Sequence, residues 1–255
     1  MSNEKVTQTN MGIGLERRDY RNGHRYKVTN GDELMLGTDM RSVTGTIGLL
    51  NKPALIPWAE KNAREGVFNV LEGYDGRMND VTFRAKVAEV VKDASKADHA
   101  SNRERGTNIH NAVDLYLTDG TEDDHEEVAP ALEAVKAWLA DLKLEVIGSE
   151  LLAYSPKWQL GGTIDFLGRY PDGRVLLADF KTGKHVYNEH IIQLAAYRAM
   201  LEGMGQQVDV TGVLLLPTGR PADWNYTEID EEKAKWGLTA MEALVSLGVA
   251  LKGMG

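Results

Sequence analysis

The chain has 255 residues and no cysteine, which excludes disulfides, zinc–thiolate sites, cysteine-bound iron–sulfur clusters and thiol catalysis. Its formal net charge of −9 argues against a protein that coats nucleic acid through a broad basic face, but not against an enzyme that binds a few phosphates locally. The composition, with 42% hydrophobic and 26% charged residues, is ordinary for a soluble protein. The sequence has no apolar run of the roughly 20 residues that a bilayer requires, and residues 1–7 lack the apolar stretch of a secretory signal. We therefore expect a soluble cytoplasmic protein.

The first 143 residues are expected to be mainly helical, with a short hairpin. Residues 1–20 show no periodicity and predict a loose arm. The Asn30-Gly31 turn signal predicts a hairpin over 24–29 and 33–36. The acidic stretch 118–125 lacks the ligand spacing of an EF-hand and is interpreted as a solvated turn between two helices. Apolar residues at three- and four-residue steps, or Pro in a first turn, predict helices over about 53–64, 81–91, 105–117 and 126–142.

From residue 144 onward, short β-branched or apolar segments bounded by turn signals predict strands. The predicted strands cover 144–154, 159–170, 174–180, 208–216 and 225–229, and the predicted helices cover 188–202 and 231–251. This order predicts an α/β (α+β) fold in which a mixed central sheet is flanked by helices. No repeat or low-complexity linker divides the chain. Residues 1–255 are therefore expected to form a single domain, with 1–143 as its N-terminal part and 144–255 as its core.

Asp179 and Lys181 form the first candidate site. On a strand, residues two apart point to the same face, so the carboxylate and the ammonium address one place. They close the apolar run 175–178, where a buried charge without a partner would be costly. The same acidic-x-Lys pattern recurs at Asp141-Leu-Lys143 and Glu231-Glu-Lys233 in predicted helices, so the tripeptide by itself is typical of a surface ion pair.

Asp165 ends a second predicted strand, one hairpin before Asp179. Such a hairpin could bring two carboxylates and one lysine to one edge of the sheet. Neighbouring carboxylates repel each other and favour a cation between them. Without cysteine, a metal would be held by oxygen and imidazole ligands, which favours magnesium or manganese. A structural Asp–Lys pair is the alternative on spacing alone.

Five motifs, in order, resemble the RecB-type branch of the PD-(D/E)xK nuclease superfamily, which includes RecB and AddAB nuclease domains, CRISPR-associated RecB-like exonucleases and many phage exonucleases. The motifs are Arg105-Gly-Thr-Asn-Ile-His110, Glu150, Gly162-Thr-Ile-Asp165, Asp179-Phe-Lys181-Thr-Gly and Gln193-Leu-Ala-Ala-Tyr197. The resemblance implies a restriction-endonuclease-like core. Some relatives carry a four-cysteine iron–sulfur cluster, which the lack of cysteine excludes here. The phosphate-loop motif of a helicase motor is also absent from the sequence.

The resemblance implies a role for each matched residue. The implied metal ligands are His110, Asp165, Asp179 and the backbone carbonyl of Phe180. Lys181 would orient or deprotonate the attacking water and stabilise charge on the phosphate. Gln193 and Tyr197 lie four apart on a predicted helix and so share a face, from which they would hydrogen-bond around Lys181 or the scissile phosphate. Glu150 would support the site from the first core strand.

Four further residues are candidates for DNA contacts: Arg103, Arg105, Lys184 and Trp158. The three basic side chains could line a groove beside His110 and Lys181, with ordinary solvated charge as the alternative. Trp158, on the turn before the Asp165 strand, could stack on a base of single-stranded DNA, with core packing as the alternative.

The resemblance implies a DNA exonuclease that uses one or two Mg²⁺ or Mn²⁺ ions at DNA ends, in phage or bacterial recombination or DNA metabolism. A structure- or site-specific endonuclease and a non-catalytic DNA-binding recombination accessory protein remain as alternatives. The expected partner is DNA, as single strands or duplex ends. A recombinase, a single-strand-binding protein or a second copy of the chain are further candidate partners. No membrane partner is expected, and a phage-encoded protein would act in the host cytoplasm.

Overall fold

The computed structural model describes residues 5–20, 23–50, 85, 104–217 and 224–253. The chain divides into two compact units, one made of residues 1–49 and 109–255 and the other of residues 50–108. In the second unit the described residues are Leu50, Ala85 and 104–108. The helices expected over about 53–64 and 81–91 therefore lie outside the described residues, apart from Ala85, which is helical.

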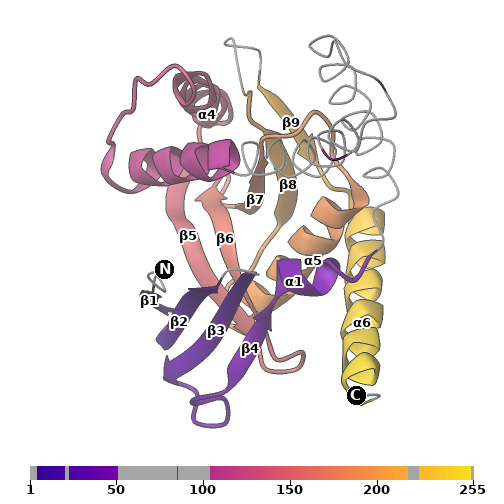
Figure 1. The fold of residues 1–255 in the computed structure, drawn as a ribbon. Helices are drawn as coiled ribbons and strands as arrows, with labels where there is room; N and C mark the ends of the chain where they lie inside the picture. The colour runs from indigo at the N-terminus through magenta and orange to yellow at the C-terminus, as the bar shows by residue number, and fades with distance from the viewer. Residues whose placement is uncertain (1–4, 21–22, 51–84, 86–103, 218–223, 254–255) are drawn as a thin grey trace. The chain divides into compact units, whose positions relative to one another are not determined.

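The N-terminal segment forms strands, which corrects the expectation of a loose arm before one short hairpin. The strands are β1 (Lys5–Asn10), β2 (Ile13–Tyr20), β3 (Gly23–Asn30) and β4 (Asp39–Ser42). Each pairs antiparallel with the next (Figure 1). Met11 and Gly12 connect β1 to β2 with positive φ angles of 51° and 81°, the geometry of a tight hairpin turn. Met11 is an unusual residue in that conformation, and the sequence pattern therefore concealed this turn.

The C-terminal part forms the rest of a mixed sheet, which confirms the expected fold class. Its strands are β5 (Glu145–Ser155), β6 (Leu160–Arg169), β7 (Val175–Lys181), β8 (Val210–Leu215) and β9 (Asn225–Glu228). The sheet order is β1-β2-β3-β4-β6-β7-β8-β9, with β5 beside β6. The β4–β6 and β7–β8 pairs are parallel and the other pairs are antiparallel.

Strand β6 is the branch point of this sheet. Strand β5 pairs along one edge of β6 from Leu160 to Arg169. The other edge is shared, because β4 pairs with residues 160–161 and β7 pairs with residues 166–169. The register leaves residues 162–165 between these two partners, so β4 and β7 diverge there. We call this opening the fork; it contains Thr163 and Asp165.

Two helical segments cover one hydrophobic cluster of the sheet. They are residues 109–119, which are the part of the helix over 104–119 that lies in the first unit, and α4 (Ala129–Leu142), which begins with a proline in its first turn. Trp138 of α4 is fully buried, and its ring centroid lies 5.0 Å from that of Phe166 and 6.0 Å from that of Phe180. Phe180 is the neighbour of Asp179 and Lys181 on β7, so this cluster supports the strand that carries both residues.

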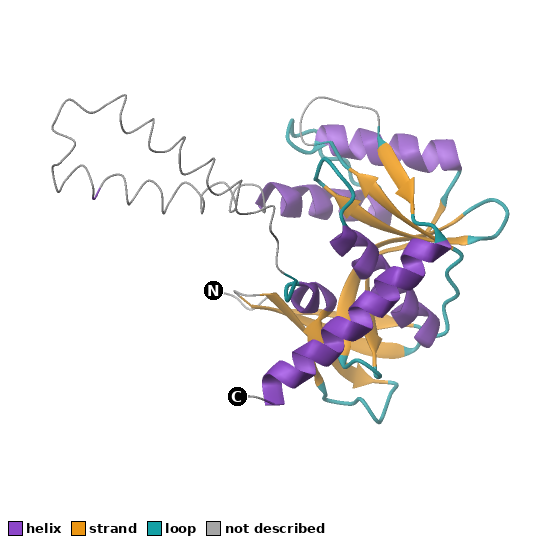
Figure 2. Ribbon diagram, turned by 90° about the vertical axis from the view of Figure 1, so that its right-hand side faces the viewer, coloured by secondary structure: helices purple, strands orange, loops and turns teal. Residues whose placement is uncertain are grey.

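The remaining helices are α1 (Val43–Ile47), α5 (Asn188–Gly203) and α6 (Glu231–Gly253). The Ser42 side chain caps α1 by accepting a hydrogen bond from the Gly45 N–H. Helix α5 packs on β5, β7 and β8, and α6 packs on α5; in Figure 2, α6 is the long helix that leads to the C-terminus. Over Glu231–Leu251, α6 has the length and hydropathy of a membrane span, a test that core helices of soluble proteins also pass.

The aromatic cluster predicts how much stability Trp138 contributes. Trp138→Ala should lower the free energy of unfolding by about 3–5 kcal/mol, because it removes a fully buried large side chain and leaves a cavity. Trp236→Ala is the matched control, because Trp236 is 46% exposed, and it should cost less than about 1 kcal/mol. Urea unfolding followed by circular dichroism measures both values, and equal losses would contradict the assignment of Trp138 to the core.

Candidate active site

Asp165 and Phe180 join β6 and β7 at the fork. The last registered pair of these strands is Phe166↔Ala178. Beyond it, the Phe180 N–H donates a hydrogen bond to Asp165 Oδ2 at 2.8 Å. A side-chain carboxylate therefore takes the place of a backbone partner and satisfies an amide that would otherwise be left without one. This bond fixes Asp165 against the end of β7.

Asp179 and Lys181 form a buried pair on β7. Strand alternation turns both side chains away from Ala178 and Phe180, which lie in the aromatic cluster. Asp179 is 1% exposed, and Lys181 Nζ lies 2.5 Å from its Oδ2. Burial raises the pKa of Asp179 to about 7, although Lys181 opposes the shift. Burial alone would lower the pKa of Lys181, but Asp179 and Asp165 outweigh it and the net shift is upward.

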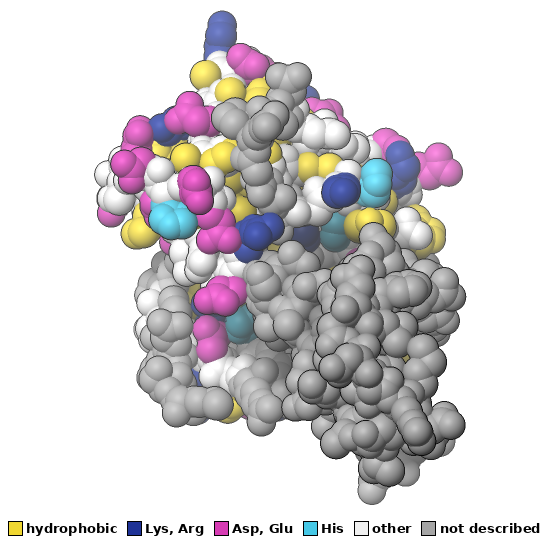
Figure 3. All heavy atoms as spheres, turned by 45° about the horizontal axis from the view of Figure 1, so that its top comes forward, with side chains coloured by type: hydrophobic (Ala, Val, Ile, Leu, Met, Phe, Trp, Pro, Cys, Tyr) yellow, Lys and Arg dark blue, Asp and Glu magenta, His cyan; other side chains and the backbone are white. Residues whose placement is uncertain are grey.

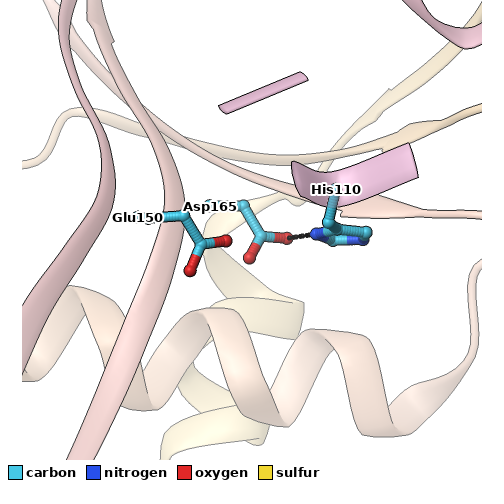
Figure 4. Close-up of side chains that lie close together, drawn as sticks. All are labelled: His110, Glu150 and Asp165. Carbon is cyan, nitrogen blue, oxygen red and sulfur yellow. Dashed lines mark ion pairs between the residues drawn. The ribbon is translucent and has the colours of Figure 1, made fainter. Parts of the chain in front are cut away.

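A second group of ligand atoms lies beside this pair. His110, in helical residues 104–119, places Nδ1 3.7 Å from Asp165 Oδ2. Glu150 of β5 completes the group, and one ligand atom from each of the three residues lies within 4.8 Å of the others. Figure 4 shows the two carboxylates side by side, with the His110 ring facing Asp165. The site therefore draws on a helix and on three strands.

Glu150 has a strained backbone. Its φ is +48°, a left-handed conformation that costs a residue with a side chain about 1–2 kcal/mol. The β5–β6 register pairs Ser149 with Phe166 and Leu151 with Ile164 but does not include Glu150. Burial, and then the nearby Asp165, raise the pKa of Glu150 to about 8, although Arg17 opposes the shift. Strain of this kind is found at sites where a side chain must be directed to a particular place.

The residues present fit a hard divalent cation. Carboxylate and imidazole groups are ligands that magnesium and manganese accept. Both Asp179 oxygens are buried, and neither accepts a hydrogen bond of normal geometry from the described residues. His110, Asp165, Asp179 and Glu150 could hold the ion, together with the Phe180 carbonyl, to which Lys181 Nζ donates at 3.4 Å. Together these donors would hold a divalent ion next to the Lys181 ammonium, and the ion would supply the activation of a water molecule.

Sequence reasoning missed two residues at this site. Arg17 of β2 lies 3.4 Å from Glu150 Oε2 through Nη1; it was overlooked because its segment was expected to be a loose arm. Asp114 lies one helical turn after His110. Its charge raises the pKa of Glu150, and its Oδ1 is buried without a hydrogen-bond partner among the described residues. The i, i+4 spacing of His110 and Asp114 was a signal that could have identified it.

Gln193 and Tyr197 of α5 contact each other. Gln193 Nε2 donates to Tyr197 Oη at 3.2 Å, and both side chains are buried. Burial raises the pKa of Tyr197 well above its usual value, and Asp165 and Asp179 add to the shift. In the described structure, Lys181 Nζ contacts Asp179 and Phe180. Gln193 and Tyr197 therefore lie near the carboxylates and bond to each other. Among the described residues, neither of them hydrogen-bonds to Lys181.

The structure describes three of the four candidate DNA contacts. Arg103 lies outside the described residues, and Arg105 belongs to the unit of residues 50–108. Lys184 is exposed three residues after Lys181. Trp158 lines a small pocket with Arg41 and Val249, seven residues before Asp165, which is roughly 20 Å along an extended strand. Figure 3 shows acidic side chains interspersed with Lys, Arg and His over the described residues of one face, so any phosphate contact there is local.

The chain is similar to one family of enzymes. Residues 121–244 match the family model of the PD-(D/E)XK nuclease superfamily. No curated protein matches the chain significantly. Among solved structures, 20 chains match. One is a protein from Eubacterium rectale named as a candidate exonuclease, with 12% identity and a TM-score of 0.39, over 55% of this chain and 64% of that chain. This chain therefore spans less than two thirds of that protein.

The raised carboxyl pKa values predict opposite pH trends for stability and for metal affinity. Glu150 and Asp179 have pKa values of about 8 and about 7 in the folded chain, whereas unfolded carboxyls titrate near pH 4. Between about pH 4 and 8 the folded state holds more protons than the unfolded state, so the free energy of unfolding should fall as pH rises. The slope is at most about 1.4 kcal/mol per pH unit for each group. Mn²⁺ affinity should rise over the same range, because ligation requires the ionised carboxylates.

Urea unfolding in the presence of a chelator, and calorimetric titration with MnCl₂, measure these two trends from pH 5 to 8. The double variant Glu150→Gln, Asp179→Asn should show a flatter stability profile. A metal-free stability that rises with pH across this range would contradict the proposed protonation of the site.

Proposed function

We propose that the chain is a divalent-metal-dependent nuclease that hydrolyses phosphodiester bonds at DNA ends, a proposal that the match of residues 121–244 to the PD-(D/E)XK nuclease superfamily model supports. The observation that carries the proposal is the convergence of His110, Glu150 and Asp165 within 4.8 Å, next to the buried Asp179–Lys181 pair. The helical histidine supports the RecB-type branch of the superfamily. A role in phage or bacterial DNA recombination or metabolism is part of the same proposal.

Each residue has a chemical task in this proposal. A divalent ion, when bound, lowers the pKa of its water and neutralises charge on the phosphate. His110, Glu150, Asp165 and Asp179 would hold the ion, and the first two of these residues lie outside the β6–β7 hairpin. Lys181 keeps its proton in the metal-free protein, since the net shift of its pKa is upward. Its ammonium therefore supports a role in orienting the water and stabilising the phosphate charge.

Gln193 and Tyr197 support the site from below. Their hydrogen bond and burial fix the helix face that lies against the carboxylates, which keeps the ligands at constant positions. The exposed Lys184, which follows the end of β7, would contact a phosphate of the substrate backbone. Arg105 is a second candidate for a backbone contact, and Trp158 is the weaker candidate because it is distant from Asp165 along β6.

The first test of the function is hydrolysis of linear duplex and single-stranded DNA with MgCl₂ or MnCl₂. Lys181→Ala and Asp179→Asn should each lower kcat by at least about 100-fold, because each removes a group that acts on the developing charge or its metal. Lys233→Ala and Asp172→Asn are matched controls at exposed ion pairs and should retain full activity. A wild-type protein that cuts neither substrate with either metal, while calorimetry shows no metal binding, would favour a non-catalytic DNA-binding accessory protein.

The second test separates an exonuclease from an endonuclease. We expect linear DNA to be degraded and covalently closed circular DNA to survive, because the substrate must enter by an end. Linear substrates blocked at the 5′ or the 3′ terminus then give the polarity. Cleavage of closed circles at a rate similar to that of linear DNA would replace the exonuclease proposal with a structure- or site-specific endonuclease.

A further inference from the structure

Arg17 connects the N-terminal strands to the metal ligands. It lies on β2, outside the residues 121–244 that match the nuclease family. Its Nη1 lies 3.4 Å from Glu150 Oε2 and donates to Thr163 Oγ1 at 3.2 Å. Its Nε lies 3.1 Å from Asp19 Oδ1, and the side chain is 20% exposed. A guanidinium with several fixed partners holds its orientation, because its donors are arranged in a rigid fork.

The other partners of this contact also come from the N-terminal strands. Tyr26 pairs with Arg17 in the β2–β3 register, and its hydroxyl lies 2.9 Å from Thr163 Oγ1. Thr163 is thus held from both sides, by a guanidinium and by a phenol. Asp19 follows Arg17 by two residues on β2 and so shares its face.

The backbone at Glu150 is held by β1 as well. Gln8 Nε2 donates to the Glu150 carbonyl at 3.5 Å, and Gln8 Oε1 accepts from the Leu152 N–H at 2.6 Å. Asn10 Nδ2 donates to the Leu152 carbonyl at 3.0 Å. These amides satisfy backbone groups at the place where Glu150 leaves the β5–β6 register with a positive φ. The N-terminal strands therefore contact Glu150 in two places. Gln8 bonds to its backbone carbonyl, and Arg17 contacts its carboxylate.

We propose that Arg17 is a positioning residue for the metal site: it holds the Glu150 carboxylate toward His110 and Asp165, against the repulsion of Asp165. This inference rests on the proposed function, in which Glu150 is a ligand of the ion. It assigns the N-terminal strands a part in building the site, in addition to extending the sheet. Removing such a supporting group typically weakens metal binding by about 10–100-fold.

The direction of the effect separates positioning from simple electrostatics. An arginine that only stood near the ion would repel it, so its removal would tighten metal binding. An arginine that orients a ligand has the opposite effect, because without it Glu150 is free to turn away from Asp165. The two roles predict changes of opposite sign in the same measurement.

The test is calorimetric titration of the full chain with MnCl₂. Arg17→Ala should raise the Kd for Mn²⁺ by about tenfold or more. Arg17→Lys should restore part of the affinity, because one ammonium can still approach Glu150 but cannot also hold Thr163 and Asp19. Arg25→Ala is the matched control, since Arg25 forms an exposed ion pair with Asp39 on the same sheet, and it should leave the Kd unchanged. Tighter or unchanged Mn²⁺ binding by Arg17→Ala would overturn the inference.

A double-mutant cycle identifies the ligand through which Arg17 acts. In a Glu150→Gln background, Arg17→Ala should have little further effect on the Kd, and an undiminished effect would also overturn the inference. If Arg17→Ala does not fold, Arg17→Gln, which keeps a longer polar side chain, and the isosteric Thr163→Val should weaken Mn²⁺ binding in the same direction. In DNA hydrolysis, the Mn²⁺ concentration for half-maximal rate should rise in Arg17→Ala more than the rate at saturating Mn²⁺ falls. A wild-type protein without Mn²⁺ binding or hydrolysis refutes the proposed function itself, whereas an active wild type with an unaffected Arg17→Ala refutes only this inference.

Discussion

The site depends on the way in which β4 and β7 share one edge of β6. Because β4 takes residues 160–161 and β7 takes residues 166–169, the strands diverge at Thr163 and Asp165. An interruption of the ladder leaves room for side chains in the middle of a sheet, where backbone bonds would otherwise fill the space. On the side of β7, the Phe180 N–H spans the fork by donating a hydrogen bond to Asp165. On the side of the N-terminal strands, Arg17 and Tyr26 span it by contacting Thr163.

Carboxylate repulsion is the cost of this arrangement. Two unit charges about 4–5 Å apart repel by roughly 3–4 kcal/mol at an effective dielectric constant of 20, and the charge of Asp165 raises the pKa of both Glu150 and Asp179. The protein offsets part of this with Lys181, Arg17 and the Phe180 amide, and with protons taken up by Glu150 and Asp179. In the proposed function a divalent cation would replace those protons, so the same repulsion that destabilises the metal-free site would provide the driving force for metal binding.

The sequence predicted the second half of the chain better than the first, for physical reasons. Strands β5 to β9 and helices α5 and α6 agree with their predicted ranges because period-two and period-three-to-four patterns were strong and turn signals such as Pro171-Asp-Gly173 separated them. Strand alternation also predicted that Asp179 and Lys181 share a face, and the hairpin predicted that Asp165 lies near them. The N-terminal strands were not predicted, for two reasons. Their first turn places Met11 in a left-handed conformation, which is unusual for methionine. In addition, the partly buried positions of β2 include the charged residues Arg17 and Asp19, which are typical of a solvent-exposed segment. No local pattern states that Arg17 meets Glu150, since this contact depends on the whole sheet.

The 133-residue separation between Arg17 and Glu150 has a consequence for the timing of synthesis. The N-terminal strands are made before β6, so β4 can pair with β6 only after β6 has emerged, and Asp179, the last of the side chains proposed as ligands, follows later. Contacts of such long range are slow to form because closure of the intervening chain opposes them. A chain that ends before β7 therefore lacks Asp179 and Lys181, and it could not complete the metal site of the proposed nuclease.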